Sequence, residues 1–149
     1  MATRRALALA AGAAMLWAGF SARAQSEDRF QARLTTVPVD FVNRALVTGA
    51  GSATAVLAAT KLSINGTFEG LSSPATVARL HNGRQRTGVR GPSVFELTVT
   101  QSTTGTISGS FDLKPDQVEA LKQGRFYIQL HSQKAPDGNL WGWLLKPER

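Results

Sequence analysis

The feature that most constrains the fold is a two-residue alternation of apolar and polar side chains along most of the chain. Successive side chains of a β-strand point to opposite faces, so the alternation predicts strands with one face in a core. Clusters of Gly, Ser, Thr, Asn and Pro separate these segments, as expected for turns. The predicted strands are Phe30–Thr35, Ala53–Ala59, Lys61–Glu69, Ala75–His81, Ser93–Thr100, Thr104–Leu113, Arg125–Ser132 and Asn139–Leu145. We therefore expect an antiparallel β-sandwich of seven or eight strands.

One segment, LKPDQVEALKQG at residues 113–124, has the pattern of a short helix instead. Pro115 suits the first helical turn, acidic residues come early, Lys122 comes late and Gly124 suits the end. Residues 37–52 (VPVDFVNRALVTGAGS) have little periodicity and are predicted to form a long connection. The expected fold is therefore all-β, with one short helix.

The first 24 residues have the order of a secretory signal peptide. A basic start is followed by the apolar run Ala6–Phe20 and by small residues at Ala22 and Ala24. That run is shorter than the roughly 20 residues of a membrane-spanning helix, although an uncleaved anchor stays an alternative. We expect a signal at residues 1–24 and a single domain at 25–149. The mature protein would be periplasmic or secreted, with no membrane span after cleavage.

Charge and cysteine content narrow the function further. The signal holds Arg4, Arg5 and Arg23, so its removal lowers the formal net charge from +7 to +4. A mild positive charge on an exported protein favours an acidic partner or a membrane surface over nucleic acid. The chain has no cysteine, which excludes thiol catalysis, iron–sulfur clusters and thiolate zinc sites. It also lacks the Gly-x-Ser-x-Gly turn of a serine hydrolase, and we expect no catalytic activity of its own.

Four segments, in order, resemble the CHRD (chordin-type) domain. They are Phe30–Leu34, GTFEGLSSPATVARLHNG, LKPDQVEALKQGRFYIQLHS and APDGNLWGWL, and the resemblance runs from Phe30 to Leu145. It implies an immunoglobulin-like or superoxide-dismutase-like β-sandwich, exported in bacteria, and it implies no enzyme. The chain departs from the family pattern in two places. Arg79 stands at the first histidine of an Ala-His-x-His strand, and Trp141 and Trp143 replace residues that are usually polar.

Strand alternation turns both histidines of the chain, His81 and His131, to the outer face. They would be the ligands of a copper or zinc site if their strands were neighbours. A stable site usually needs three or four ligands, and the cation of Arg79 would oppose the metal. The alternative is a pair of histidines that form hydrogen bonds on a sheet surface, with no cofactor at all.

The closing hairpin suggests a docking surface. An apolar inner face results if His131 lies across from Trp141 and Gln129 across from Trp143. The outer face would then carry aromatic and basic side chains suited to binding a partner. The predicted binding residues are Trp141, Trp143, Tyr127, Arg79, Arg84 and Arg86. Two alternatives remain open: the arginines of residues 83–92 form a solvated loop, or the N-terminal segment or residues 36–52 cover the tryptophans.

The resulting functional hypothesis is a non-catalytic accessory subunit that binds a larger periplasmic or membrane-associated protein. Its concrete form is the small subunit of a membrane-associated quinoprotein–cytochrome dehydrogenase. The competing hypothesis is a periplasmic copper- or zinc-binding protein that uses His81 and His131.

Overall fold

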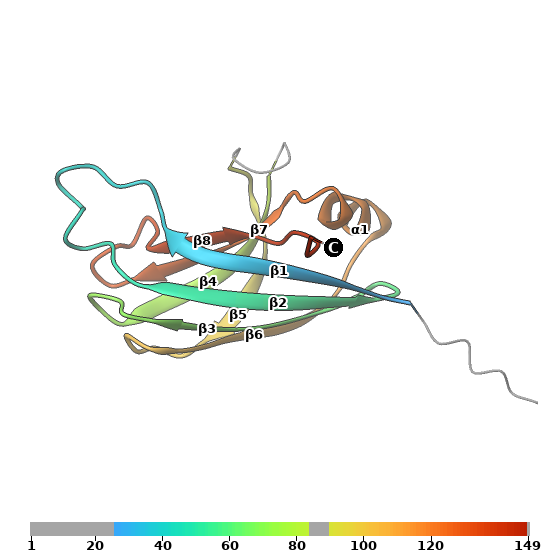
Figure 1. The fold of residues 1–149 in the computed structure, drawn as a ribbon, viewed down its shortest axis with the longest axis horizontal. Coiled ribbons are helices and arrows are strands. Elements are labelled where there is room, and N and C mark those ends of the chain that lie inside the picture. The colour runs from blue at the N-terminus through green and yellow to red at the C-terminus, as the bar shows by residue number, and fades with distance from the viewer. Residues whose placement is uncertain (1–25, 84–89, 149) are drawn as a thin grey trace, which may run out of the picture.

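The computed structural model describes residues 26–83 and 90–148, which form eight antiparallel strands and one helix (Figure 1). The predicted signal peptide lies outside the described residues. All eight predicted strands and the predicted helix are confirmed, with ends that shift by a few residues. The elements are β1 (Glu27–Thr36), β2 (Ala50–Ala58), β3 (Lys61–Glu69), β4 (Ala75–Asn82), β5 (Ser93–Val99), β6 (Gly105–Asp112), α1 (Pro115–Lys122), β7 (Phe126–Ser132) and β8 (Leu140–Trp143).

The strands close into a barrel in the order β1-β2-β3-β6-β5-β4-β7-β8. Two strands change partner along their length. Residues Glu27–Leu34 of β1 pair with β2, whereas Thr35 and Thr36 pair with β8. Likewise, the first part of β5 pairs with β4, and Thr98 and Val99 pair with β6. Because hydrogen bonding is continuous around the ring, the predicted two-sheet sandwich is not confirmed.

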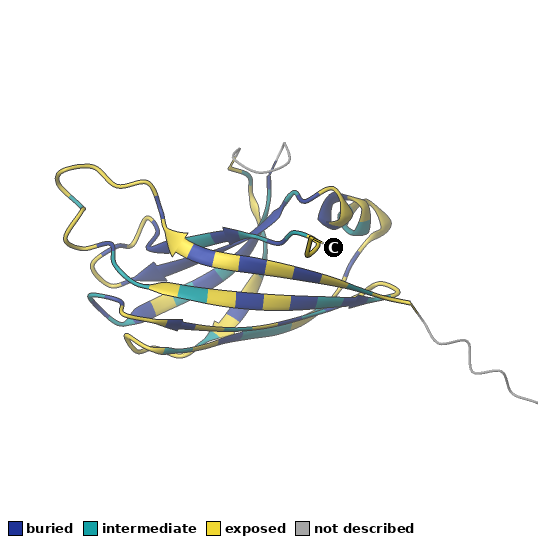
Figure 2. Cartoon of the chain, viewed as in Figure 1, coloured by how far each residue is buried: buried dark blue, intermediate teal, exposed yellow. Residues whose placement is uncertain are grey.

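The barrel interior is the hydrophobic core, and the alternation in sequence produces it directly. Buried and exposed residues alternate along β1 and β2 (Figure 2). The inward side chains include Phe30, Leu62, Ile64, Leu80 and Ile128, each with at most 1% of its surface exposed. Strand β7 differs, since all seven of its residues are buried. Its outer face is therefore covered as well as its inner face.

The closing hairpin has the predicted faces but not the predicted pairing. Leu130 pairs with Leu140, Gln129 with Trp141 and Tyr127 with Trp143, a shift of two residues from the expected register. The faces survive because a shift of two residues preserves the alternation. The cause lies in the turn, where the amide of Asn139 donates to the carbonyl of Leu130 at 2.8 Å. His131 therefore lies beyond the last pair and not across from Trp141.

Helix α1 lies at one end of the barrel and contributes Ala120 and Leu121 to the core (Figure 1). The amide of Lys114 donates to Oε1 of Gln117 at 2.9 Å at its start. Gly124 follows its end with a φ of 72°, a left-handed conformation that glycine adopts without strain. No helix among the described residues is long and apolar enough to span a membrane.

Gly142 provides a test of barrel closure. A Cβ atom at this position would collide with the carbonyl of Arg33 and the side chain of Leu34 on β1. We expect Gly142→Ala to lower the free energy of unfolding by about 1–3 kcal/mol, as overpacking does in well-packed cores. Urea titration followed by tryptophan fluorescence measures it. Gln133→Ala, at an exposed turn position, is the control. Equal stability of the two variants would contradict the tight approach of β8 to β1.

Candidate functional site

The strand order brings most of the predicted site residues onto one outer face. Strand β7 lies between β4 and β8. Across these strands, His81 pairs with Tyr127 and Tyr127 with Trp143, while Arg79 pairs with Gln129 and Gln129 with Trp141. We call the cluster of His81, Tyr127, Trp141 and Trp143 the aromatic face. The docking-surface hypothesis required the strand of Arg79 and His81 to lie beside the closing hairpin, and the structure places it there.

The four rings of the aromatic face are in contact with one another. The imidazole of His81 stacks on Tyr127, with centroids 4.8 Å apart and an interplanar angle of 10°. The ring centroid of Tyr127 lies 4.6 Å from that of Trp143 and 6.2 Å from that of Trp141, and the Trp141 ring meets Tyr127 edge-on. Such pairs each stabilise by about 0.5–1.5 kcal/mol beyond their buried area. The rings therefore form one packed unit.

The aromatic face points outward as predicted, but it is not open to solvent. Tyr127 is only 1% exposed, and both tryptophans are half-buried. Val37, Val47 and Ala135 pack with Trp141 in a second apolar cluster. Tyr127 thus lies on the predicted outer face, but segments that are distant in sequence fold over it.

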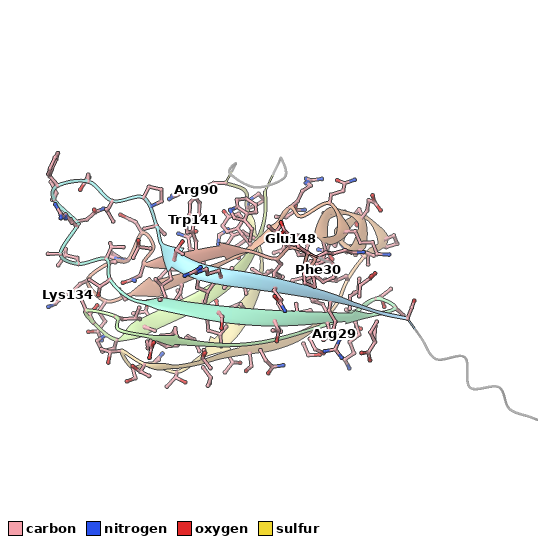
Figure 3. All side chains as sticks on the ribbon, in the orientation of Figure 1. Arg29, Phe30, Arg90, Lys134, Trp141 and Glu148 are labelled. Atoms are coloured by element: carbon pink, nitrogen blue, oxygen red, sulfur yellow. The ribbon has the colours of Figure 1, made fainter. Side chains whose placement is uncertain are left out.

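Part of this cover comes from Arg90 and Gly91, directly after the six residues 84–89. The guanidinium of Arg90 lies over Trp141, 5.5 Å from the ring centroid, and Figure 3 labels both side chains. The backbone amide of Gly91 donates to the hydroxyl of Tyr127 at 3.2 Å. Arg90 is thus a basic residue of the face that was absent from the predicted set. A cation over an indole adds about 0.5–1 kcal/mol at such a site.

Of the three arginines predicted to bind a partner, one lies among the described residues. Arg79 lies on the same outer face and forms an ion pair with Glu96 of β5 at 3.9 Å. Both side chains are well exposed, so this pair contributes little to stability. Arg84 and Arg86 lie outside the described residues.

Both histidines are anchored through the same ring nitrogen. Nδ1 of His81 lies 3.0 Å from the carbonyl oxygen of Gly91, and Nδ1 of His131 lies 2.8 Å from that of Pro136. Burial lowers the pKa of His81, against the opposing effect of the Gly91 hydrogen bond. Repulsion from His131 in its protonated form and from the cations of Arg79 and Arg90 lowers this pKa further. Burial likewise lowers the pKa of His131, with a smaller contribution from Arg79. Both rings are therefore neutral at pH 7.

Metal ligation by three or more side chains has no basis among residues 26–83 and 90–148. No group of three His, Cys, Asp or Glu side chains lies close enough there to hold an ion. Asp137 of the β7–β8 turn, the nearest acidic residue in sequence, raises the pKa of His131 only as the last of four effects. Among the described residues, His81 and His131 are therefore not joined by a third side chain that could complete a metal site.

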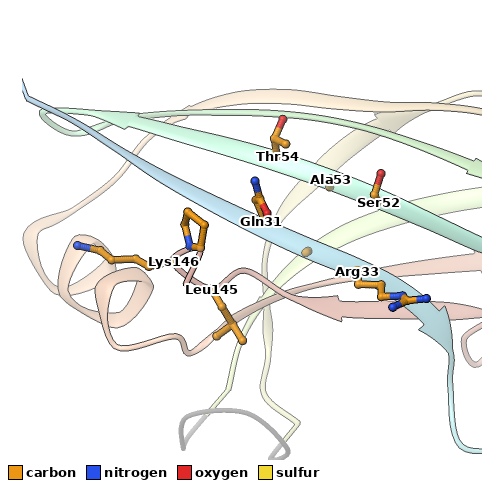
Figure 4. Close-up of a pocket in the computed structure, with 9 residues that line it drawn as sticks. Gln31, Arg33, Ser52, Ala53, Thr54, Leu145 and Lys146 are labelled. Atoms are coloured by element: carbon orange, nitrogen blue, oxygen red, sulfur yellow. The ribbon is translucent and has the colours of Figure 1, made fainter. Parts of the chain in front are cut away.

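A shallow depression lies elsewhere on the barrel. It lies between β1, β2 and the segment after β8, and its lining includes Gln31, Ser52, Thr54 and Lys146 (Figure 4). No carboxylate or imidazole lines it, so Lys146 has no acidic or histidine side chain beside it in this lining.

The family model of the CHRD domain matches residues 30–144. This chain belongs to the CHRD domain family. The resemblance drawn from the four sequence segments is thus confirmed, over nearly the range expected. No curated protein and no solved structure matches the chain.

This CHRD domain has an exposed apolar feature that the sequence reasoning missed, in the connection between β1 and β2. Phe41 is 98% exposed and Val42 is 87% exposed. The carboxylate of Asp40 accepts hydrogen bonds from the amides of Val42 and Asn43, each at 2.9 Å. We call residues 38–46 the Phe41 loop. The signal in the sequence was Asp-Phe-Val-Asn, since two turn-forming residues bracket two apolar ones.

The histidines of this CHRD domain predict a pH dependence of stability. A histidine with a lowered pKa binds its proton more tightly in the unfolded chain. The stabilisation is therefore complete above pH 6.5, the ordinary histidine value, and is lost as the pH falls toward the folded pKa. Urea titrations at about pH 5 and about pH 7.5 measure it.

The matched control is the double variant His81→Asn/His131→Asn, which removes both titrating rings and should flatten the profile in this window. Asp28, whose pKa is lowered mainly by its hydrogen bond with Lys146, titrates below 3.8 and does not interfere. An unchanged profile in the double variant would refute the assignment.

Proposed function

We propose that this CHRD domain is a non-catalytic accessory domain that docks on a larger periplasmic or membrane-associated protein through the Phe41 loop. The observation that carries the proposal is the nearly complete exposure of Phe41 and Val42. Val39 and Leu46 of the same loop are 45% and 36% exposed. Several large apolar side chains exposed within one short loop are typical of an interaction site.

Hydrogen bonds hold the loop in a defined shape. The carbonyl of Leu46 accepts from the hydroxyl of Ser72 in the β3–β4 turn, and Thr48 donates to the carbonyl of Gly70 at 2.8 Å. Nδ2 of Asn139 donates to the carbonyl of Thr48 at 2.7 Å. A loop ordered before binding loses less conformational entropy when it docks. The two apolar side chains are therefore presented as a preformed anchor.

The aromatic face supports this loop from below. Val37 and Val47, which flank the Phe41 loop, pack with Trp141. The amide of Val37 also donates to the carbonyl of Asn139 at 3.0 Å, next to the start of β8. We therefore assign Trp141 a supporting role, and the contact with the partner moves to Phe41 and Val42. The basic side chain of Arg44, exposed in the same loop, favours an acidic rim around the partner's apolar pocket.

The concrete form of the proposal is the small subunit of a membrane-associated quinoprotein–cytochrome dehydrogenase. Small size and the predicted export signal support that form. In such a complex the domain would stabilise assembly without contacting the substrate. The partner would be the dehydrogenase or its cytochrome, and it would supply an apolar pocket for Phe41.

The exposed anchor is tested by Phe41→Ser and Val42→Ser. Each should leave the free energy of unfolding within about 0.5 kcal/mol of the parent, since neither side chain is packed. Each should weaken binding to the purified dehydrogenase–cytochrome complex by about 30-fold, the scale of an interface hot spot. Surface plasmon resonance with the mature chain measures the affinity. Val42→Ile keeps the apolar surface and should bind normally. Unchanged affinity in both serine variants would contradict docking through the loop.

The Trp141→Ser variant tests whether Trp141 supports the Phe41 loop or contacts the partner directly. Because the indole packs on Val37, Val47 and Ala135, its loss should lower the free energy of unfolding by about 1–3 kcal/mol. Thermal unfolding followed by circular dichroism measures this. If the Trp141→Ser variant were as stable as the parent but no longer bound the partner, the aromatic face and not the Phe41 loop would be the contact surface.

A further inference from the structure

The orientation of the Phe41 loop depends on how its two ends are attached to the barrel. The loop lies at the end of the barrel that also carries the β3–β4 and β7–β8 turns (Figure 1). Its large apolar side chains are exposed, so their burial contributes little to its conformation. The hydrogen bonds from Val42 and Asn43 to Asp40 shape the tip of the loop and do not attach it to the barrel. The direction in which Phe41 projects is therefore determined where the loop meets the barrel.

Asn139, in the connection between β7 and β8, bonds to both ends of the loop. Its backbone carbonyl accepts from the amide of Val37 at 3.0 Å, directly before the loop. Its side-chain Nδ2 donates to the carbonyl of Thr48 at 2.7 Å, just after the loop. Among the described residues, no other forms hydrogen bonds with both Val37 and Thr48. Asn139 therefore closes the loop, as in compact surface segments whose ends lie close together.

The side-chain amide of Asn139 has one orientation that satisfies its partners. The residue is fully buried, and its Oδ1 accepts at 2.9 Å from the hydroxyl of Ser132, which is equally buried. The carbonyl of Thr48 can only accept, so the amide nitrogen must face it. The backbone amide of Asn139 also donates to the carbonyl of Leu130 at 2.8 Å. A buried polar network whose members are paired is rigid, so the contact with Thr48 is held in a fixed geometry.

The turn that carries Asn139 is itself fixed by β7. Nε2 of Gln129 donates to the carbonyl of Asp137 at 3.0 Å. The next residue, Gly138, has a φ of 140°, a conformation that residues with a side chain rarely adopt. A Cβ atom at Gly138 would collide with Nε2 of Gln129 and would lie 3.3 Å from Cγ1 of Val37. The turn thus passes closely between β7 and the start of the Phe41 loop, which places Asn139 within reach of both loop ends.

We propose that Asn139 is the positioning residue of the docking contact, because it joins the two ends of the loop and so holds Phe41 and Val42 in the orientation that the partner binds. This role rests on the proposed docking function, since Asn139 is buried and acts through the loop. Asparagine suits the position because one short side chain must donate to Thr48 and accept from Ser132 at once. An aspartate has the same shape but offers no donor when it is ionised.

The direct test is amide hydrogen exchange, measured by NMR at neutral pH on the full mature chain with Asn139→Asp. The reporters are the amides of Val37 and Val47, which donate to the carbonyls of Asn139 and Asn43. Loss of the Nδ2 donor leaves a carbonyl unpaired, so both amides should exchange about 5- to 100-fold faster. Amides of β3 should keep their protection, which shows that the barrel remains folded. Unchanged exchange at both reporters would overturn the proposal.

Two further variants control for charge and for folding. Asn65→Asp makes the same chemical change at an exposed position of β3 and should exchange like the parent at both reporters. An equal acceleration in Asn65→Asp would mean that added charge, and not the lost donor, is the cause. Ser132→Ala removes the hydroxyl that orients the amide of Asn139 and should accelerate the same amides by a smaller factor. If Asn139→Asp does not fold, Ser132→Ala decides alone, and parent-like exchange in it would refute the role of Asn139.

A double-mutant cycle with Phe41→Ser separates positioning from general stabilisation. Asn139→Asp alone should weaken binding to the purified dehydrogenase–cytochrome complex by about 10-fold, because only molecules with a closed loop bind. In the Phe41→Ser background the anchor is already absent, so Asn139→Asp should have little further effect. Losses that multiply independently in the double variant would contradict a positioning role.

The two measurements tell apart a failure of the loop closure from a failure of the docking function. Hydrogen exchange needs no partner, so unchanged exchange in Asn139→Asp counts against loop closure by Asn139 alone. Unchanged affinity in Phe41→Ser counts against docking through the loop, and with it against Asn139 as the positioning residue of that contact. Faster exchange together with weaker binding in Asn139→Asp, and no further loss in the double variant, is the result we expect.

Discussion

Closure of the strand ring is the constraint on which the other features of this CHRD domain depend. Strands β1 and β5 each pair with different neighbours at their two ends, so that the hydrogen-bonded ladder continues around the barrel. Among the described strands, each pairs with a neighbour on both sides over at least part of its length, which limits pairing with another chain. Closure also sets β4, β7 and β8 side by side, which brings together residues more than 60 positions apart in sequence, such as Arg79 and Trp141. The aromatic face and the histidine pair both result from this adjacency.

The sequence predicted the strands and their faces because both follow from a two-residue period. All eight strands, the helix at Pro115–Lys122 and the outward direction of His81, Tyr127 and Trp141 could be derived in this way. The pairing of β7 with β8 could not, since it depends on the hydrogen bonds of the turn before Asn139. Whether the strands form a sandwich or a barrel depends on the points at which β1 and β5 change partner. The alternation of apolar and polar residues does not indicate these points.

The burial of the outer face also could not be predicted from the local pattern of apolar and polar residues. An outward side chain becomes buried when a segment distant in sequence covers it, as Gly91 covers Tyr127 from 36 positions away. The Phe41 loop was missed for the opposite reason. Its apolar residues have no periodicity, so they indicated a connection, whereas their exposure is decided by the hydrogen bonds of Asp40, Ser72 and Asn139. The proposed docking contact thus lies in a segment between the strands, where binding residues are often found.

The pairing of β1 with β8 has a consequence for how the chain folds. Thr35 and Thr36 pair with Trp141 and Leu140, so the ring is completed by residues more than 100 positions apart. Contacts of such long sequence separation are slow to form, because a large loop must close before they stabilise the chain. The ring cannot be completed until the last strand has been synthesised. Barrel closure is therefore a late step that follows synthesis, and until then the apolar faces of the earlier strands depend on neighbours other than β8 for protection from aggregation.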